Sequence, residues 1–507
     1  MSKAAQGGPL TRDSGDQFAG SRLMHPRNFL LAVRDSGYRS TSYAVAELVD
    51  NAIQADACEV RIQIEKSQDD PHPILLTVAD NGVGMTKPTL SLALSFGGST
   101  RFDDRTSLGR YGMGLPTATL SCARRVDVVS WRGPVAHRAR LDLDELIRSD
   151  AITLPPIERT TSRWSKSFGW KTGTVVQLSR CDRLAYQRVG WLKARLAADL
   201  SRIFRQFIKQ GLRIIVNDSP LQPFDHLMLT HDHGTRSARA FGEQLVYALP
   251  TGHGSGHVRV RFSELPVQAW VAVSSEEKRL AGITNGSPVS VLRSGREIVH
   301  GWYFMGGKRR ENYDDWWRCE IDFDPALDEL FGLSHAKQSI SPTDELVATL
   351  STDLEPIARA LNSRVRRGFE LTKLSDPLRK AEVVAEKANS SLPQLKVPAR
   401  TSRHHLSPRR PYELELADLG STLPYEVAVD CGNLRLRINT GHPLFTDLYS
   451  PLANSDSAAD REAATRVALS ILATARAEFP MPTSTSGDPE GRGRWGDILA
   501  TFLSRCA

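Results

Sequence analysis

The sequence predicts an α+β protein of several domains, because segments with helical spacing of apolar residues alternate with strand-like apolar segments. The 507 residues exceed the length at which a single core stops growing, which favours about three domains. Hydrophobic residues make up 40% of the chain and charged residues 24%, as in an ordinary globular protein. The balance of periodic segments and composition therefore excludes a fibrous or low-complexity chain.

Composition also restricts the environment and the partners of the protein. The N-terminus is small and polar, and nowhere do about 18 apolar residues run together, which argues against secretion and membrane spanning. Six scattered cysteines without a C-x-x-C pair predict reduced thiols in a cytoplasmic protein. The net charge of +7 permits a polyanionic partner such as DNA and does not require one.

The first 180 residues predict an α+β domain. Segment 41–57 has apolar residues on one helical face, and Thr41 or Ser42 is a suitable N-cap. Segments 59–65 and 74–80 are typical of a half-buried and a fully buried strand. The glycine-rich segment 95–114 predicts a long loop. The remaining elements expected in this domain are a helix over 115–123 and strands over 126–131 and 173–179.

Two further domains are expected after this one. A helix near 188–210 and a strand at 212–218 lead to a mixed domain with strands at 257–262, 267–273 and 290–298 and a helix from Thr343 to about Thr372. Segment 373–411 begins helical and then becomes rich in proline and arginine, which predicts an exposed linker. The last domain should contain strands at 412–419, 425–431 and 434–440 and a helix at 458–478.

Glu47 and Asn51 form the first candidate site. They are four residues apart, so on a helix both side chains face the same way, and Asp50 and Gln54 widen this polar stripe. A carboxylate here suits a general base for water, and the amide oxygen one turn away suits a Mg²⁺ that is bound mainly by phosphates. The alternative is the solvated side of an amphipathic helix.

Asp80 ends a strand and opens the sequence D-N-G-V-G-M. Gly82 and Gly84 carry no side chains, so a flat ring could approach the backbone closely. A buried carboxylate needs donors, and the exocyclic amine of adenine is a suitable one. Asp-Asn-Gly is also a common hairpin turn, and that alternative stays open.

Gly109, Gly112 and Gly114 precede a predicted helix in G-R-Y-G-M-G. Free backbone N–H groups and the positive end of the helix dipole favour a phosphate chain at such a position. Glycine-rich loops before helices are frequent, so this motif is weak by itself.

The order of these motifs, followed by Gly173 and Thr174 at the head of a strand, resembles the Bergerat-fold (GHKL) ATPases, which include gyrase, histidine kinases, MutL and MORC proteins. The resemblance covers residues 40–180. It implies an α/β sandwich that binds ATP together with Mg²⁺. Glu47 would be the general base, and Asn51 would be a ligand of the Mg²⁺ cofactor. The implied ATP-binding residues are Asn51, Asp80, Gly82, Gly84, Met85, Gly97, Gly98, Ser99, Thr100, Gly109, Arg110, Tyr111, Gly112, Met113, Gly114 and Thr174. Many relatives have Asp where this chain has Gln54, which puts an adenine-side role of that residue in doubt.

The second domain resembles the transducer (S5 domain 2-like α/β domain) of gyrase, MutL and MORC proteins in FGLSHAKQSISP. The resemblance implies that Lys337 is a catalytic residue that reaches the γ-phosphate, which suits a point charge that senses the last phosphate. A solvated surface lysine is the alternative. A histidine kinase is disfavoured, because more than 300 residues follow the pocket and no dimerisation helix precedes it. We find no MutL-type nuclease motif, and no zinc site in the last domain.

The layout is closest to MORC and MutL-like ATPases. It predicts an ATP-binding domain at 20–225, a transducer-like domain at 226–372, a basic linker at 373–411 and a C-terminal interaction domain at 412–507. The resemblance implies an ATP-gated homodimeric clamp with slow hydrolysis, acting in DNA transactions such as repair, silencing or defence. The basic tract at 400–410 suits phosphate contacts to DNA and equally suits a plain linker. The rival is a chaperone-like or signalling ATPase with a protein client.

Overall fold

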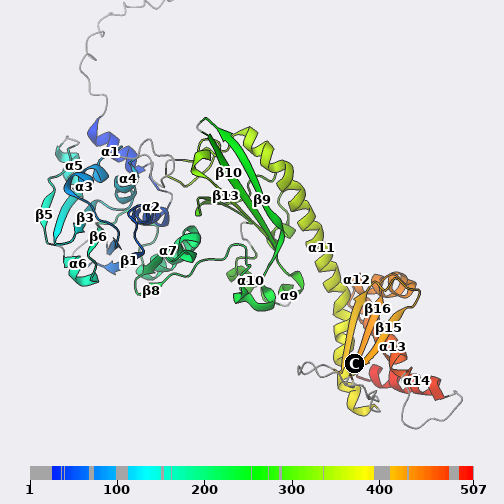
Figure 1. The fold of residues 1–507 in the computed structure, drawn as a ribbon. Helices are drawn as coiled ribbons and strands as arrows, with labels where there is room; N and C mark the ends of the chain where they lie inside the picture. The colour runs from blue at the N-terminus through cyan, green and yellow to red at the C-terminus, as the bar shows by residue number, and fades with distance from the viewer. Residues whose placement is uncertain are drawn as a thin grey trace, which may run out of the picture. The chain divides into compact units, whose positions relative to one another are not determined.

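The computed structural model describes residues 25–505 except 36, 39, 68–72, 99–111, 150–152, 162, 253, 272, 285–287, 335, 393–410, 431–432 and 479–489. The chain divides into two compact units, which we describe separately (Figure 1). The first unit comprises Met1–Glu264, Asn285–Glu311 and Trp317–Ile357. The second unit comprises Leu265–Thr284, Asn312–Trp316 and Ala358–Ala507.

An eight-stranded sheet with the order β5-β4-β3-β6-β2-β1-β7-β8 organises the N-terminal part of the first unit. Its strands are β1 Glu59–Lys66, β2 Ile74–Asp80, β3 Arg125–Arg132, β4 Val135–Asp142, β5 Glu158–Thr160, β6 Thr172–Ser179, β7 Arg213–Val216 and β8 Ser219–Pro220. The accompanying helices are α1 Pro26–Asp35, α2 Thr41–Gln54, α3 Lys87–Leu94, α4 Gly114–Cys122, α5 Leu143–Ser149, α6 Arg163–Phe168, α7 Val189–Ile203 and α8 Arg205–Lys209. The apolar faces of α2, α4 and α7 share one core with strands β1, β2, β3 and β6.

A second sheet, of five strands, completes the first unit in the order β12-β11-β13-β10-β9. The strands are β9 Arg239–Thr251, β10 Gly254–Glu264, β11 Val289–Arg293, β12 Arg296–Gly301 and β13 Trp317–Phe323. Short 3₁₀ helices lie at His231–Arg236 and Pro325–Leu327. The long helix α11, Asp344–Ala388, begins in this unit and continues in the second.

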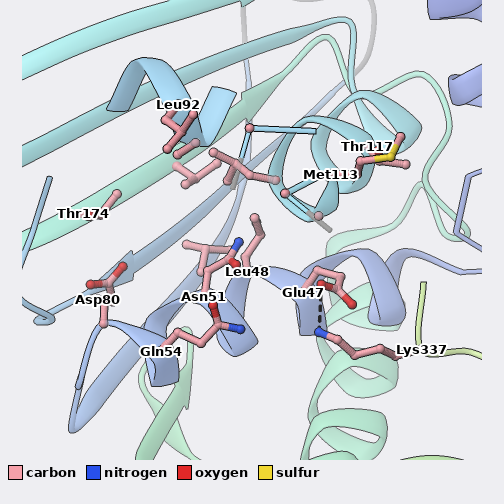
Figure 2. Close-up of a pocket in the computed structure, with 18 of the residues that line it drawn as sticks. Glu47, Leu48, Asn51, Gln54, Asp80, Leu92, Met113, Thr117, Thr174 and Lys337 are labelled. Atoms are coloured by element: carbon pink, nitrogen blue, oxygen red, sulfur yellow. Dashed lines mark hydrogen bonds and ion pairs between the residues drawn. The ribbon is translucent and has the colours of Figure 1, made fainter. Parts of the chain in front are cut away.

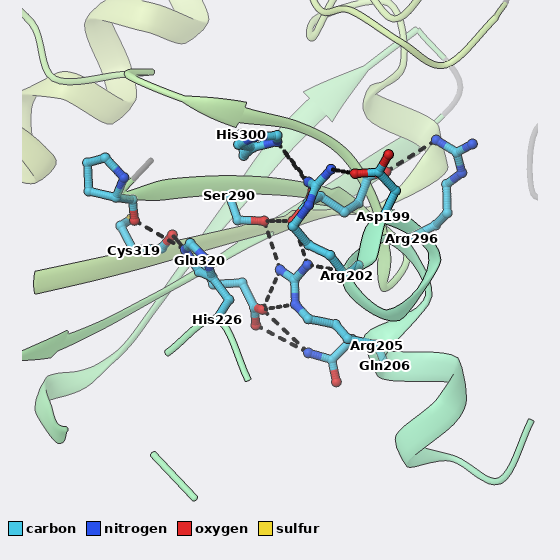
Figure 3. Close-up of polar contacts among 12 residues, drawn as sticks. Asp199, Arg202, Arg205, Gln206, His226, Ser290, Arg296, His300, Cys319 and Glu320 are labelled. Atoms are coloured by element: carbon cyan, nitrogen blue, oxygen red, sulfur yellow. Dashed lines mark hydrogen bonds and ion pairs between the residues drawn. The ribbon is translucent and has the colours of Figure 1, made fainter. Parts of the chain in front are cut away.

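Arg205, the first residue of α8, joins the helices beside the first sheet to the second sheet (Figure 3). Its side chain is 1% exposed. The Arg205 guanidinium donates to Glu320 Oε2 on β13 at 2.8 Å and to Glu297 Oε2 on β12 at 2.6 Å. A further donation reaches Ser290 Oγ on β11 at 2.8 Å. One buried cation therefore holds three strands of the second sheet against α8.

The second unit contains a three-stranded sheet in the order β14-β16-β15. Its elements are α9 Val267–Val271, α10 Ser275–Leu280, η2 Asn312–Trp316, η4 Asn389–Ser391, β14 Tyr412–Ala417, β15 Tyr425–Asp430, β16 Asn433–Asn439, the π-helix Leu444–Tyr449, α12 Ser450–Asn454, α13 Ala458–Ala477 and α14 Glu490–Leu503. Buried residues of α11, β14, β16, α13 and α14 form its core.

The α+β prediction is confirmed, and most predicted elements are observed near their expected bounds. Segment 267–273 was expected to be a strand, and this expectation is wrong, because Val267–Val271 is helical. The buried residues there are Val267 and Trp270, whose spacing of three is that of a helix. Segment 290–298 was expected to be one strand and is a hairpin. Its turn residues Ser294 and Gly295 both have positive φ, as a two-residue hairpin turn requires.

The long helix ends at Ala388, beyond the expected end near Thr372. Leu378, Ala381 and Ala385 are buried in the core of the second unit. The beginning of the segment predicted as a linker is therefore part of a packed helix, and the apolar spacing along 374–388 explains why. The basic tract of this segment, including Arg400, lies outside the described residues. Within the described part of the chain, no helix is both long and apolar enough to cross a membrane.

Candidate functional site

A cavity of about 300 Å³ lies in the first unit between α2, the end of β2, α4 and the loop before α11 (Figure 2). Residues that are far apart in the sequence line it, among them Glu47, Asn51, Asp80, Thr174 and Lys337. Most predicted site residues that the structure describes thus line one cavity, although Gly82 and Gly97 do not. Its volume is within the range of small-molecule sites.

Helix α2 forms one wall of the cavity and presents Glu47, Asn51 and Gln54 to it (Figure 2). Glu47 is only 4% exposed and Asp50 is fully buried. The other side of the helix, with Val45 and Val49, packs in the core. The polar stripe therefore does not face solvent, and the alternative of an amphipathic surface helix does not describe α2.

Asp80 lies at the end of β2, opposite Thr174 on β6. Its Oδ1 accepts a hydrogen bond from the Gly82 N–H at 2.9 Å. Burial raises the pKa of the Asp80 carboxyl to about 6, and hydrogen bonds from the backbone of Gly82 and Thr174 oppose this shift. The Thr174 hydroxyl lies 2.9 Å from Ser130 Oγ, which also accepts from the Met85 N–H at 2.7 Å. Backbone contacts therefore hold in place a polar wall whose oxygen atoms can accept a hydrogen bond from an amine.

The D-N-G-V-G-M turn has a structural role in addition to its place beside the cavity. Asn81 Oδ1 accepts from the backbone N–H groups of Cys58 at 3.0 Å and Glu59 at 2.9 Å, which ties this turn to the start of β1. Gly84 has φ +69°, and a Cβ atom there would lie 2.2 Å from the Trp131 carbonyl oxygen. Only glycine fits this position. The turn therefore fixes the backbone next to Asp80.

The glycine-rich loop is described at its two ends. The Gly97 N–H donates to the Gly112 carbonyl at 3.1 Å, so the ends are tied together. Gly98, Gly112, Met113 and Gly114 line the cavity, and α4 begins at Gly114. A Cβ atom at position 114 would lie 3.0 Å from Glu47 Oε2, so the helix start lies directly against the predicted general base. The predicted positions Ser99, Thr100, Gly109, Arg110 and Tyr111 lie outside the described residues.

Lys337 reaches the cavity from the loop that precedes α11 (Figure 2). It is 6% exposed, so it is not a solvated surface lysine. Its Nζ donates to Asp50 Oδ2 at 2.8 Å and to Glu47 Oε2 at 3.2 Å. Asp50 also pairs with Arg296 on β12, whose Nε lies 3.2 Å from Asp50 Oδ2. Two carboxylates of α2 therefore face two cations from the second sheet and its following loop.

The two carboxylates have opposite pKa shifts. Burial raises the pKa of Glu47, although Lys337 opposes the shift. Burial also acts against ionisation of Asp50, but Arg296 and Lys337 together hold its pKa below the ordinary value. A carboxylate with a raised pKa beside one that stays ionised is the arrangement expected when one group accepts a proton and the other keeps a fixed charge.

Three buried polar atoms of the cavity wall have no hydrogen-bond partner among the described residues. They are Glu47 Oε1, Gln54 Nε2 and Thr117 Oγ1. Because buried polar groups are nearly always paired, these atoms are available to a polar ligand or to water in the cavity. The wall also fits Mg²⁺, which needs one or two protein oxygens when phosphates supply the rest, and Asn51 offers such an oxygen. No cluster of three or more His, Cys, Asp or Glu suited to a metal occurs among the described residues.

Residues 38–171 match the family of histidine kinase-, DNA gyrase B- and HSP90-like ATPases. The match covers strands β1 to β5 of the first sheet, helix α2 and both ends of the glycine-rich loop. This part of the chain is a GHKL-type ATPase domain. Thr174, on β6, lies three residues beyond the end of the matched range.

The chain is also similar to MORC proteins. It is 41% identical over 78 residues to the mouse ATPase MORC2B and 37% identical over 78 residues to the human ATPase MORC2, in each case over 15% of this chain and 8% of the relative. It is 33% identical over 177 residues to the mouse MORC family CW-type zinc finger protein 3, over 34% of this chain and 18% of the relative. These alignments span less than a fifth of each relative.

Several residues of the GHKL site were not predicted from the sequence. Asp50 was considered only as part of a polar stripe, although it contacts Lys337, which lines the cavity, and Arg296 behind it. Arg296 was read only as part of a strand. Arg293 and Tyr38 also line the cavity, and Arg293 forms a two-point ion pair with Asp328. No local pattern indicates the contacts of Arg293 and Arg296, because they depend on the docking of the second sheet on the GHKL domain.

Replacing Asp80 by asparagine is expected to weaken ATP binding to the GHKL domain at least about tenfold, or about 1.4 kcal/mol. If the Asp80 carboxylate receives the adenine amine, the amide would present a donor where that amine needs an acceptor. The fold should not suffer. Because the pKa of Asp80 is raised, ionisation of its carboxyl lowers the free energy of unfolding as the pH rises through about 6. The amide of asparagine does not ionise and has no such effect. Calorimetric titration with ATP and a melting curve at pH 7 test both points.

The shape-matched control is Asn81→Asp, which alters the turn and leaves the Asp80 carboxylate in place. Normal ATP affinity in Asp80→Asn would mean that D-N-G is only a turn. A large loss of melting temperature would mean that the carboxylate is needed for folding, contrary to the direction of its pKa shift.

Proposed function

We propose that this chain binds ATP together with Mg²⁺ and hydrolyses it slowly, using its GHKL domain and a lysine from a transducer-like domain. One observation supports this most directly. Glu47 and Lys337, 290 residues apart, lie in contact on the wall of one cavity, next to the start of α4. A general base and a cation for the last phosphate are the two groups that phosphate hydrolysis needs beside the phosphate chain.

Each residue then has a definite task. Asp80 and Thr174 receive the adenine, and the backbone N–H groups at Gly112 to Gly114 face the phosphates. Asn51 would hold Mg²⁺, which neutralises phosphate charge when bound. Glu47 takes the proton of the attacking water through its unpaired Oε1, and Lys337 balances the charge that develops on the γ-phosphate. Neither step needs a residue from outside the cavity.

We further propose an ATP-gated homodimeric clamp that acts on DNA. The similarity to MORC proteins supports this proposal. We propose a GHKL domain at 20–225, a transducer at 226–372 and an interaction domain at 412–507, located in the cytoplasm. A chaperone-like or signalling ATPase with a protein client is the alternative. A hydrolysis rate that rises with DNA favours the clamp, and a rate that rises only with a protein favours the alternative.

The dimer should respond to the last phosphate. If Lys337 contacts the γ-phosphate, a non-hydrolysable ATP analogue should drive dimerisation and ADP should not, because a ligand shifts an equilibrium only by its differential affinity for the two states. Lys337→Ala should bind nucleotide through the adenine side and remain monomeric. Sedimentation of both proteins with analogue, with ADP and without nucleotide tests this.

Lys308→Ala is a suitable control, because Lys308 is also a buried lysine of the first unit but does not line the cavity. It should dimerise with the analogue like the unaltered protein. Equal dimer populations under all three nucleotide conditions would exclude gating, while the assignment of the cavity would stand.

A further inference from the structure

Four charged groups form a buried cluster at the edge of the cavity. Asp50 and Arg296 are both 0% exposed, and Glu47 and Lys337 are nearly so. The cluster contains two carboxylates and two cations, so its charges balance. Removing a single member would leave one buried charge uncompensated. The four residues therefore act as a unit.

Asp50 is linked to both ends of Lys337, directly at the ammonium and through Arg296 at the backbone. Its Oδ2 accepts directly from the ammonium at 2.8 Å. It also pairs with Arg296, whose Nη1 donates to the backbone carbonyl of Lys337 at 3.0 Å. Lys337 has φ +50°, a conformation that is uncommon for a residue with a side chain and that its surroundings must maintain. Asp50 thus fixes both the charged tip and the backbone of Lys337.

Building on the proposed function, we propose that Asp50 is the positioning residue that holds Lys337 for recognition of the γ-phosphate and thereby sets the preference for ATP over ADP. An ammonium group has three donors. Asp50 accepts one of them and Glu47 another, which leaves a third for an oxygen in the cavity. When Lys337 turns toward a γ-phosphate, Asp50 keeps the ammonium in place, and Glu47 is free to accept the proton of water.

A purely structural role for Asp50 makes a different prediction. If the carboxylate only balanced the charge of Arg296, its loss would weaken binding of ATP and ADP together by disturbing the fold. A positioning role affects only the nucleotide that carries a γ-phosphate. The ratio of the two affinities therefore separates the two roles.

The test compares the affinities of an ATP analogue and of ADP in the full chain and in Asp50→Asn. We expect the preference for the analogue to fall by about thirtyfold or more, the scale on which losing one partner of a buried charge pair weakens binding, with ADP affinity changed by less than about threefold. Adding Lys337→Ala to Asp50→Asn should lower the preference for the analogue no further, because the two changes remove the same interaction. An unchanged preference, equal losses for both nucleotides, or a further loss in the double variant would overturn the proposal.

Two more variants keep the test decisive. The double variant Asp50→Asn, Arg296→Met removes one charge of each sign, so the charges of the cluster stay balanced. It replaces Asp50→Asn if that single variant does not fold. Its preference for the analogue over ADP should fall by the same factor. Asp142→Asn is the matched control, because Asp142 is also buried and paired with two arginines but lies outside the cavity. The preference of the Asp142→Asn variant for the analogue over ADP should be normal. If the unaltered chain binds neither nucleotide, the proposed function itself fails, which the first measurement shows before any variant is made.

Discussion

Replacing Glu47 by alanine is expected to lower the rate of ATP hydrolysis by about two orders of magnitude while ATP binds with near-normal affinity. Glu47 Oε1 is unpaired on the cavity wall, so it is available to a water molecule. The other oxygen accepts from Lys337, which retains Asp50 as a partner when Glu47 is removed. The binding wall around Asp80 is untouched. Steady-state hydrolysis and calorimetric ATP affinity are the two measurements.

Glu47→Gln is the stricter version of this experiment, since it keeps the size of the side chain and an oxygen that can accept from Lys337, while it removes the negative charge and the ability to take a proton. It should be as slow as the alanine variant. Glu145→Gln, on α5 and outside the cavity, should hydrolyse ATP at the normal rate. An unchanged rate in Glu47→Gln would remove this residue from the mechanism and leave the cavity as a binding site only.

The parts of the GHKL site that are close in the sequence were predictable from local spacing. Glu47 and Asn51 lie one helical turn apart, and the helix is indicated by its own apolar residues. Asp80 follows a continuous apolar strand, and Gly114 precedes a helix. Each of these motifs fixes a short backbone segment. Their order then indicated the family, and the family match supports it.

The contacts between distant segments were not predictable in the same way. Asp50 and Arg296 are 246 positions apart, and neither residue carries a pattern that indicates the other. Strand β9 was not predicted at all, because much of it is exposed and its apolar alternation is interrupted by Gly242 and Pro250. Lys337 was placed by family resemblance alone. The physical reason is that a buried ion pair is specified by tertiary docking, whereas helices and strands are specified by local periodicity.

The same docking depends on the buried cluster around Arg205. Although burial opposes ionisation of Glu320, Arg205 and Arg261 lower its pKa to about 2. A depressed pKa contributes stability that is fully present above the ordinary value of about 4.5 and is lost as the pH falls through about 2. Glu297 is equally buried and pairs with Arg205 and Arg202. Loss of Arg205 leaves each carboxylate with one fewer cation.

Replacing Arg205 by methionine is therefore expected to lower the free energy of unfolding by about 3 kcal/mol, the usual scale for breaking a buried ion pair. Denaturant unfolding, followed by tryptophan fluorescence, measures this loss. The difference in free energy of unfolding from the unaltered protein should narrow below pH 4.5, because protonation of Glu320 removes part of the same interaction.

Adding Glu320→Gln to Arg205→Met should restore part of the stability, since it removes a carboxylate that has lost a partner. Arg466→Met, which breaks the exposed pair with Glu462 on α13, should change unfolding little. Equal effects of Arg205→Met and Arg466→Met would mean that the Arg205 cluster does not hold the second sheet in place.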